Sequence, residues 1–337
     1  MGSMQLLPPT ASAHAADMDW LFAALIGTSA FILLLVFGLM IGFCVRYRKG
    51  SKVERGNRLG RTWRVETAWT VATFIGFLGL YFWGADLYVG IHSPPKDATD
   101  IYVVGKQWMW KIEHPGGQRE IDTLHVPVGK PVRLVLTSQD VIHDFAIPAF
   151  RVRQDAVPGR YEALWFTPTK VGEYRLFCAE FCGTWHARMG GSVVVMEPSD
   201  FQRWLDSQDP GPSLAQEGEA LFRSYGCSGC HGTASTVHAP KLEGLFGRPV
   251  PLEDGRTVIA DDRYIRDSIL KPKSEIAAGY PPVMPSFAGQ IGEDDLLKLV
   301  AYIKSLADKT AQNSQTGQAA GQSQAGQAAG SAERPTE

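Results

Sequence analysis

Residues 178–189 read Cys-Ala-Glu-Phe-Cys-Gly-Thr-Trp-His-Ala-Arg-Met, and this stretch determines what fold must surround it. It carries two thiolates (Cys178, Cys182), an imidazole (His186) and a thioether (Met189). Soft sulfur ligands together with imidazole select copper over hard cations. Because two cysteines four residues apart can share both sulfurs between two ions, the stretch predicts a loop that holds a pair of bridged coppers.

Each copper then needs one imidazole and one weak axial ligand, and the loop supplies only one histidine. His143 is the natural candidate for the second imidazole, because it follows a strand-like run at residues 132–136 and would lie beside the loop in a β-sandwich. The alternative interpretations of the two cysteines are a disulfide, as in secreted domains, or a zinc site. A disulfide would leave His186 and Met189 at ligand spacing without a role.

The pattern Cys-x-Glu-x-Cys-Gly-x-x-His-x-x-Met, with His-Asp-Phe upstream at residues 143–145, resembles the dinuclear copper (CuA) motif of cytochrome c oxidase subunit II. The resemblance implies two bridging cysteines, one histidine for each copper and two weak axial ligands: Cys178, Cys182, His143, His186, Met189 and the backbone carbonyl of Glu180. It also implies that the carboxylate of Glu180 binds a magnesium ion shared with subunit I.

Length and composition limit the number of domains and the classes of partner. A chain of 337 residues has room for two or three domains. A formal charge of −2, with no basic patch in the polar region, argues against a nucleic-acid partner. Four of the five cysteines fall into two metal-type clusters, and Cys44 stands alone in an apolar run, where we expect it to pack as a small hydrophobic side chain.

Two apolar runs, residues 20–47 and 65–91, each exceed the roughly 20 residues that span a bilayer. Between them, residues 46–64 hold eight Lys and Arg against the single acid Glu54. Short loops rich in Lys and Arg stay on the cytoplasmic side. The sequence therefore predicts a transmembrane hairpin, preceded by a polar N-terminal segment (residues 1–19), with both termini and everything after Ile91 outside the cytoplasm.

Glu66 lies at the cytoplasmic start of the second span. It is either a capped helix start or part of a proton path, since ionisable groups at membrane depth are functional candidates. Residues 65–70, Val-Glu-Thr-Ala-Trp-Thr, are similar to the subunit II segment whose glutamate lies near a proton-channel entrance in subunit I. The family usually has a proline shortly afterwards, whereas this chain has Val-Ala-Thr-Phe at residues 71–74.

Residues 92–198 alternate short apolar runs with Pro- and Gly-containing turns, which predicts an all-β domain of two packed sheets. By resemblance this is a cupredoxin-like sandwich. Trp108 and Trp110, at a spacing of two, are typical of sheet packing. The resemblance instead implies that Trp108 is the surface tryptophan where electrons arrive from cytochrome c. His114 and His125 fit neither metal cluster, and we interpret them as ordinary loop or strand-end residues.

A linker (residues 199–212) leads to a third domain, residues 213–308. Ser213 and Gln216 form a predicted capping box. The helix that follows ends in Cys227-Ser-Gly-Cys230-His231, the pattern of c-type haem attachment, in which the two thioethers bring His231 under the iron. A zinc or disulfide Cys-x-x-Cys is the alternative.

Met284 is the only methionine after His231 and lies in the rigid stretch Pro-Pro-Val-Met-Pro, residues 281–285. We expect it to be the second axial ligand, because His/Met ligation raises the haem potential as a donor to copper requires. His238 is the alternative axial ligand, but it is too close to the attachment motif in the sequence to reach the far face of the haem easily. With a last helix over residues 293–306, the domain is similar to an all-α class I cytochrome c. Residues 309–337 are Gln, Ala, Gly and Ser repeats that predict disorder.

Together these features predict a multidomain membrane protein that resembles subunit II of a caa-type bacterial cytochrome c oxidase. The resemblance implies an electron relay from haem c to CuA to a haem-copper subunit I that reduces oxygen and pumps protons. Subunit III and a donor such as cytochrome c or another respiratory carrier are the further expected partners, and the bacterial plasma membrane is the expected location, with both metal domains on its outer face. The alternatives are the copper-bearing small subunit of a nitric oxide reductase and a stand-alone membrane-anchored carrier.

Overall fold

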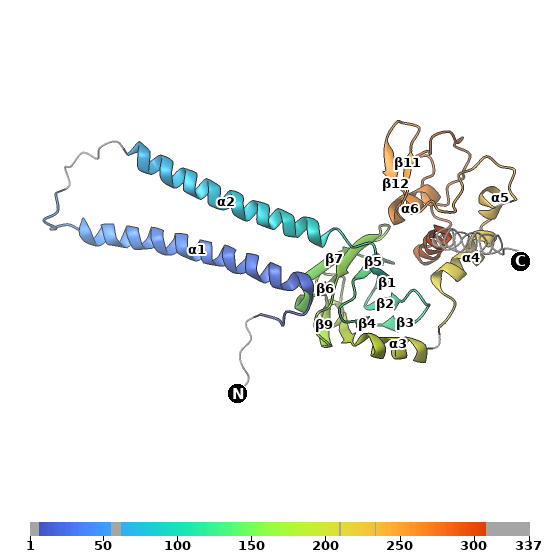
Figure 1. Ribbon diagram of the computed structural model, residues 1–337, viewed down its shortest axis with the longest axis horizontal. Coiled ribbons are helices and arrows are strands. Elements are labelled where there is room, and N and C mark those ends of the chain that lie inside the picture. The colour runs from blue at the N-terminus through green and yellow to red at the C-terminus, as the bar shows by residue number, and fades with distance from the viewer. Residues whose placement is uncertain (1–6, 55–61, 209, 233, 308–337) are drawn as a thin grey trace, which may run out of the picture.

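The computed structural model describes residues 7–54, 62–208, 210–232 and 234–307. The described part consists of a pair of long helices, a β-sandwich at one end of the pair, and a helical domain beside the sandwich on the side away from the helices (Figure 1). The expected fold class is therefore confirmed. The tail for which the sequence predicts disorder lies outside the described residues.

The two long helices are α1 (Ala13–Arg46) and α2 (Trp63–Ile91). Their most apolar windows have mean hydropathies of 2.5 and 1.5, and no part of either window is buried within the protein. A core helix of a soluble domain would have its apolar surface covered by neighbouring elements. An apolar, uncovered helix of this length instead fits the hydrocarbon core of a bilayer.

Both helices are attached to the sandwich at the same end of the hairpin. Immediately before α1, the Ser12 hydroxyl donates to the carbonyl of Phe150 at 2.8 Å. At the end of α2, the carbonyl of Gly90 accepts a hydrogen bond of 3.2 Å from the Trp165 indole. Helix α1 begins at Ala13, ahead of the apolar span predicted at residues 20–47. These contacts explain the earlier start, because the first turn of α1 packs on the sandwich.

Two five-stranded sheets form the sandwich, in the orders β3-β2-β1-β5-β8 and β4-β10-β9-β6-β7. The strands are β1 (Thr99–Lys106), β2 (Met109–Glu113), β3 (Arg119–Ile121), β4 (Thr123–Pro127), β5 (Val132–Ser138), β6 (His143–Ile147), β7 (Val152–Ala156), β8 (Glu162–Phe166), β9 (Gly172–Cys178) and β10 (Gly190–Met196), with 3-10 turns η1 (Pro148–Phe150) and η2 (His186–Arg188). Pairs β1–β5 and β4–β10 are parallel, and the other pairs are antiparallel.

The core between the sheets contains four large aromatic residues with essentially no exposure: Trp110, Phe145, Phe150 and Phe166. Strands β6 and β9 are antiparallel neighbours, with Phe145 opposite Cys178. The start of β6 and the end of β9 therefore lie at the same edge of the sheet. This pairing brings His143 to the loop that follows β9, as the sequence predicts.

Helix α3 (Pro198–Ser207) covers a polar cluster beside the sandwich. Its Trp204 ring stacks on His125 with centroids 4.3 Å apart. Glu120 lies between two histidines, with Oε1 2.7 Å from Nε2 of His114 and Oε2 2.5 Å from Nδ1 of His125. His114 is 2% exposed. His114 thus lies just after β2 and His125 within β4, and both belong to a largely buried cluster that the tryptophan of α3 covers.

The helical domain contains α4 (Leu214–Ser224), α5 (Ser228–His231), α6 (Asp262–Leu270), a two-stranded ribbon of β11 (Pro249–Pro251) and β12 (Thr257–Ile259), and a final helix through residues 293–307. The predicted capping box is confirmed: Ser213 accepts from the backbone of Gln216, whose side chain accepts from the backbone of Ser213. Helix α4 crosses the final helix closely at Gly218, where a Cβ would lie 2.0 Å from the carbonyl of Lys298.

Candidate metal centres

Two cysteines and two histidines meet at the end of the sandwich. The Sγ atoms of Cys178 and Cys182 are 3.8 Å apart, far longer than the roughly 2.05 Å of a disulfide. Nδ1 of His143 lies 4.0 Å from Sγ of Cys178, and Nδ1 of His186 lies 3.5 Å from Sγ of Cys182. The ligand atoms of His143, Cys178 and Cys182 all lie within 4.8 Å of one another, and the three residues are buried.

Each sulfur also has a weaker neighbour. The carbonyl oxygen of Glu180 lies 3.3 Å from Sγ of Cys178, and Sδ of Met189 lies 3.6 Å from Sγ of Cys182. The backbone returns Met189 to this position, because its carbonyl accepts a 3.1 Å hydrogen bond from the N–H of Cys178. The cluster therefore has two similar halves, each with a sulfur, an imidazole and one weak donor. Such a donor set fits copper.

Before a metal binds, the two thiols ionise differently. Burial opposes ionisation of Cys178, but contacts with His143 and with backbone groups lower its pKa to about 7. Burial, followed by repulsion from Cys178, raises the pKa of Cys182 to about 12. Thiolates are the metal-binding form, so a metal that takes both sulfurs must displace the Cys182 proton, and its binding depends on pH.

A second candidate centre lies in the helical domain. Cys227, Cys230 and His231 share one tight turn around α5. Nδ1 of His231 lies 2.9 Å from the carbonyl of Pro240. That hydrogen bond fixes the ring and leaves Nε2 as the atom that can bind iron.

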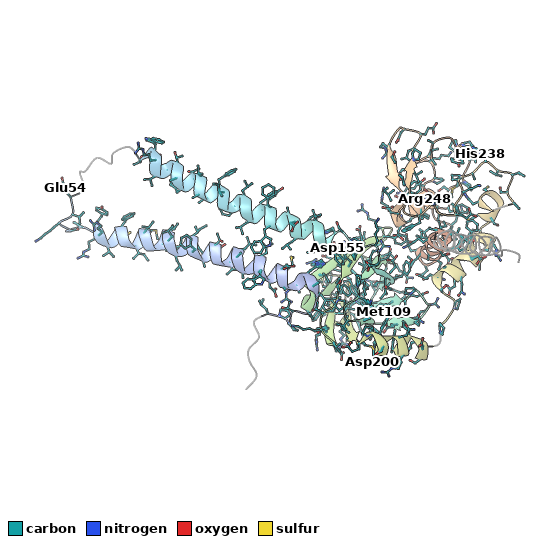
Figure 2. The ribbon with its side chains drawn as sticks, in the orientation of Figure 1. Glu54, Met109, Asp155, Asp200, His238 and Arg248 are labelled. Atoms are coloured by element: carbon teal, nitrogen blue, oxygen red, sulfur yellow. The ribbon has the colours of Figure 1, made fainter. Side chains whose placement is uncertain are left out.

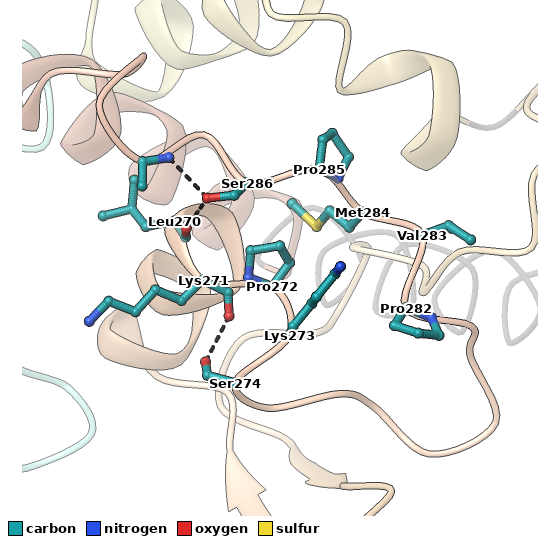
Figure 3. A pocket seen from close by; sticks show the side chains of 11 residues that line it. Leu270, Lys271, Pro272, Lys273, Ser274, Pro282, Val283, Met284, Pro285 and Ser286 are labelled. Atoms are coloured by element: carbon teal, nitrogen blue, oxygen red, sulfur yellow. Dashed lines mark hydrogen bonds between the residues drawn. The ribbon is translucent and has the colours of Figure 1, made fainter.

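Met284 lines a cavity of about 540 Å3, within the range of cofactor sites. Figure 3 shows its thioether turned toward the ring of Pro272. The rival ligand, His238, is engaged elsewhere: its ring stacks on Tyr280 with centroids 4.8 Å apart, and Nε2 lies 3.1 Å from the carbonyl of Gly279. The two cysteines and the fixed His231 ring suit a c-type haem, and Met284 is a better candidate than His238 for the second iron ligand.

Comparisons with known proteins agree with this geometry. The profile of the cytochrome c oxidase subunit II periplasmic domain matches residues 102–197, and that of cytochrome c matches residues 215–307. The alternative cytochrome c oxidase subunit 2 of Bradyrhizobium diazoefficiens is 31% identical over 187 residues, which cover 46% of this chain and 68% of the relative. The chain belongs to the cytochrome c oxidase subunit 2 family.

Two further relatives complete the comparison. Cytochrome c oxidase subunit 2 of Alkalihalophilus pseudofirmus is 27% identical over 295 residues, or 82% of this chain and 83% of the relative. The crystal structure of the periplasmic domain of subunit II of cytochrome oxidase from Bradyrhizobium japonicum is 34% identical and covers 34% of this chain and 96% of that chain, with a TM-score of 0.34.

This chain is therefore a cytochrome c oxidase subunit II with a fused cytochrome c domain, a His/Cys site like CuA, and two helices that span the membrane below periplasmic domains. Membership in the family implies a complex with subunit I and, from the two domains, copper and haem c as cofactors. We call residues 92–198 the copper domain and residues 213–307 the cytochrome domain below.

The structure does not bring every predicted site residue of this subunit II together. Glu66 lies in the first turn of α2, at the end of the hairpin away from the sandwich (Figure 1). The Glu180 side chain is exposed, with only its carbonyl directed at Cys178. Trp108 packs against the sandwich core and stacks on Trp185 with centroids 6.1 Å apart. Trp185 is largely exposed and directly precedes His186.

Sequence reasoning missed Asp140, which orients the site. Its Oδ1 lies 2.8 Å from Nε2 of His143, so the ring presents Nδ1 to the sulfurs. Its Oδ2 accepts a 2.8 Å hydrogen bond from the backbone of Gln107, whose side chain donates to the carbonyl of Cys182 at 2.8 Å. One carboxylate thus joins a copper ligand to the hairpin that carries Trp108. The only signal in the sequence is an acid three residues before the histidine.

Proposed function

We propose that this chain relays electrons through a dinuclear copper centre bridged by Cys178 and Cys182. The observation that carries the proposal is the division of the cluster into two similar halves. In it, His143 and His186 would each bind one copper, and Met189 and the carbonyl of Glu180 would be the weak ligands. A rigid sandwich end suits this role, because a site whose geometry barely changes between oxidation states exchanges electrons efficiently.

In the cytochrome domain, Cys227 and Cys230 would hold the haem through thioethers, and His231 and Met284 would bind its iron. The hydrogen bond from His231 to Pro240, the cavity beside Met284 and the engagement of His238 with its own loop support this assignment. When bound, the two centres supply one-electron chemistry: an electron passes from the haem iron to the copper pair and then to subunit I. The residues of this chain hold the centres, keep water away from the sulfurs and orient the imidazoles.

Several finer assignments belong to the same proposal. Trp108 is the tryptophan through which electrons enter the copper pair, and an outside donor, cytochrome c or another respiratory carrier, reduces the haem. The carboxylate of Glu180 binds magnesium at the contact with subunit I, and Glu66 stands at the start of a proton path. Subunit III is a further partner, and the membrane is the bacterial plasma membrane. Oxygen reduction and proton pumping take place in the partner subunits.

Metal analysis of the full chain in detergent tests the relay. We expect two coppers and one iron per chain, a mixed-valence copper signal by electron paramagnetic resonance (EPR), and a low-spin haem c spectrum. A fully loaded preparation with zinc or a single copper would contradict it. The complex that co-purifies with the chain should consume oxygen, whereas nitric oxide consumption would indicate the reductase branch, and a chain that always migrates alone would indicate a free carrier.

A further inference from the structure

A buried cluster of alternating charges joins the cytochrome domain to the copper domain. Lys304 of the final helix is 9% exposed, and its Nζ lies 2.9 Å from Asp100 of β1 and 2.8 Å from Asp262 of α6. Arg133 of β5 forms two hydrogen bonds with Asp100, at 2.6 and 2.7 Å, and lies 3.6 Å from Asp262. Each domain contributes one acid and one base. We call these four residues the Lys304 cluster.

Apolar side chains from both domains pack together beside the Lys304 cluster. Six buried residues form this apolar contact, three from each domain: Tyr102, Val104, Val135, Leu214, Leu297 and Ala301. The Lys304 ammonium also lies 5.4 Å from the centroid of Tyr102 and 4.8 Å from that of Phe246. Partly buried charges attract each other more strongly than charges in bulk water, and removal of one leaves another unpaired.

Such a cluster specifies one arrangement of the two domains. A purely apolar contact tolerates sliding, whereas these four charges, of which Lys304 and Asp262 are buried, lose their partners if either domain shifts. The cytochrome domain is docked against β1 and β5 through these charges.

In that position the haem attachment site faces away from the copper domain. Helix α5 lies on the side of the cytochrome domain remote from the sandwich (Figure 1). Met109, which follows Trp108, and His238, which precedes the Pro240 partner of His231, lie far apart (Figure 2). Among the described residues, the hydrogen bonds and ion pairs between the domains involve α4, α6 and the final helix, but neither α5 nor residues 281–285.

Building on the proposed function, we propose that the Lys304 cluster holds the cytochrome domain in a receiving position, and that its release is required before the electron reaches copper. While docked, the haem is open to an outside donor. After release, one electron passes from ferrous iron, which becomes ferric, to the oxidised copper pair, and no bond or proton is exchanged. Lys304 is then a positioning residue that controls the fraction of molecules in which the haem can approach the copper pair.

A measurement of the distance between the two domains tests the docking and does not depend on the copper or haem centre. Nitroxide labels are attached through non-cysteine side chains introduced at the exposed positions Glu173 and Glu253, one in each domain, and pulsed EPR is recorded on the full chain. The parent chain should give one narrow distance and Lys304→Met a broad distribution. Lys304→Arg should keep the narrow distance. Lys241→Met, at an exposed position of the cytochrome domain, is the matched control.

The rate of electron transfer from photoreduced haem to copper tests the consequence. An observed rate scales with the fraction of molecules in the competent state, so Lys304→Met should raise it by at least about tenfold, with no change in Lys304→Arg. Asp100→Asn weakens the cluster from the copper domain and should also raise the rate of electron transfer. This variant provides the test if Lys304→Met fails to fold.

Three results would overturn the proposal: a broad distance distribution in the parent chain, an unchanged distribution in Lys304→Met, or a rate that stays equal or falls once the domain is released. A falling rate would mean that the docked position delivers electrons. If copper or haem c spectra are missing altogether, the proposed relay fails instead, and the distance measurement still decides whether the cluster docks the domain.

Discussion

Single residues determine how well the copper site is organised before any metal arrives. His143 has no exposed surface and is held by Asp140, while the backbone hydrogen bond between Cys178 and Met189 closes the loop. The ligands therefore lose little freedom when a metal binds. The remaining cost is a proton, because burial and repulsion from the Cys178 thiolate raise the pKa of Cys182.

Cys182→Ser should abolish the dinuclear copper signal and leave the haem spectrum unchanged. A neutral hydroxyl cannot bridge two coppers as a thiolate does, and the haem residues belong to the other domain. EPR and visible absorption of the full chain measure both. Cys44→Ser, on the exposed surface of α1, is the control. A surviving mixed-valence signal would exclude the bridging assignment.

Asp140→Ala should weaken copper binding by about 10–100-fold, because the partner of a ligating histidine fixes its ring and its protonation. Competition with a copper chelator measures the affinity. Asp206→Ala, on the exposed end of α3, is the control for a lost carboxylate. Equal affinities in the two variants would mean that the sandwich alone positions His143.

Met284→Leu should lower the haem potential and remove the sulfur-to-iron charge-transfer band, because the thioether favours the reduced iron. His238→Ala should leave both unchanged, since the hydrogen bond and stacking of that ring keep it with Gly279 and Tyr280. Redox titration and visible absorption distinguish the two ligands. The reverse pattern would assign the second axial position to His238.

Among the helices and strands, the features that depend only on residues close in the sequence were predicted correctly. The capping box at Ser213 and the two apolar spans were readable because each depends on neighbouring residues. The cluster of His114, His125 and Glu120 was not, because its burial comes from Trp204 on α3, far along the chain. A histidine in a strand carries no local sign of the helix that covers it.

Gly218→Ala should destabilise the cytochrome domain by about 1–3 kcal/mol or more, the usual cost of overpacking. The added Cβ would meet the carbonyl of Lys298 at 2.0 Å, so α4 and the final helix must move apart. Thermal unfolding followed by haem absorbance measures the loss. Gly292→Ala is the control, because a Cβ there has no atom within 4 Å. Equal stability of the two variants would exclude a tight helix crossing.

For the whole molecule, the sequence identified three parts but not how the last two meet. Asp100 and Lys304 are 204 residues apart, and each is an ordinary charged residue in its own strand or helix pattern. Their pairing depends on two finished surfaces, which no periodicity or motif encodes. The same holds for Trp185, whose stacking on Trp108 needs the hairpin and the copper loop to meet.

The pKa shifts in the Lys304 cluster determine how docking depends on pH. Burial alone would raise the pKa of Asp100, but Arg133 and Lys304 lower it overall. Its contribution is therefore present above the unfolded pKa, about 3.9, and lost as pH falls through the lower folded value. Burial alone would lower the pKa of Lys304, but Tyr102 and the two carboxylates raise it overall. That contribution is present below about pH 10.4 and lost only as pH rises through the higher folded value.

We therefore expect the distance between labels at Glu173 and Glu253 to remain narrow from about pH 5 to about pH 9, since neither shifted pKa falls inside that window. The distance should also stay narrow in about 1 M salt. At that concentration the Debye length is about 3 Å, so salt weakens exposed charge pairs far more than buried ones. Pulsed EPR across this range measures it, with Lys304→Met broad throughout as the control. Broadening of the parent chain near neutral pH or with added salt would mean that exposed pairs, such as Arg119 with Glu217, hold the domains together instead.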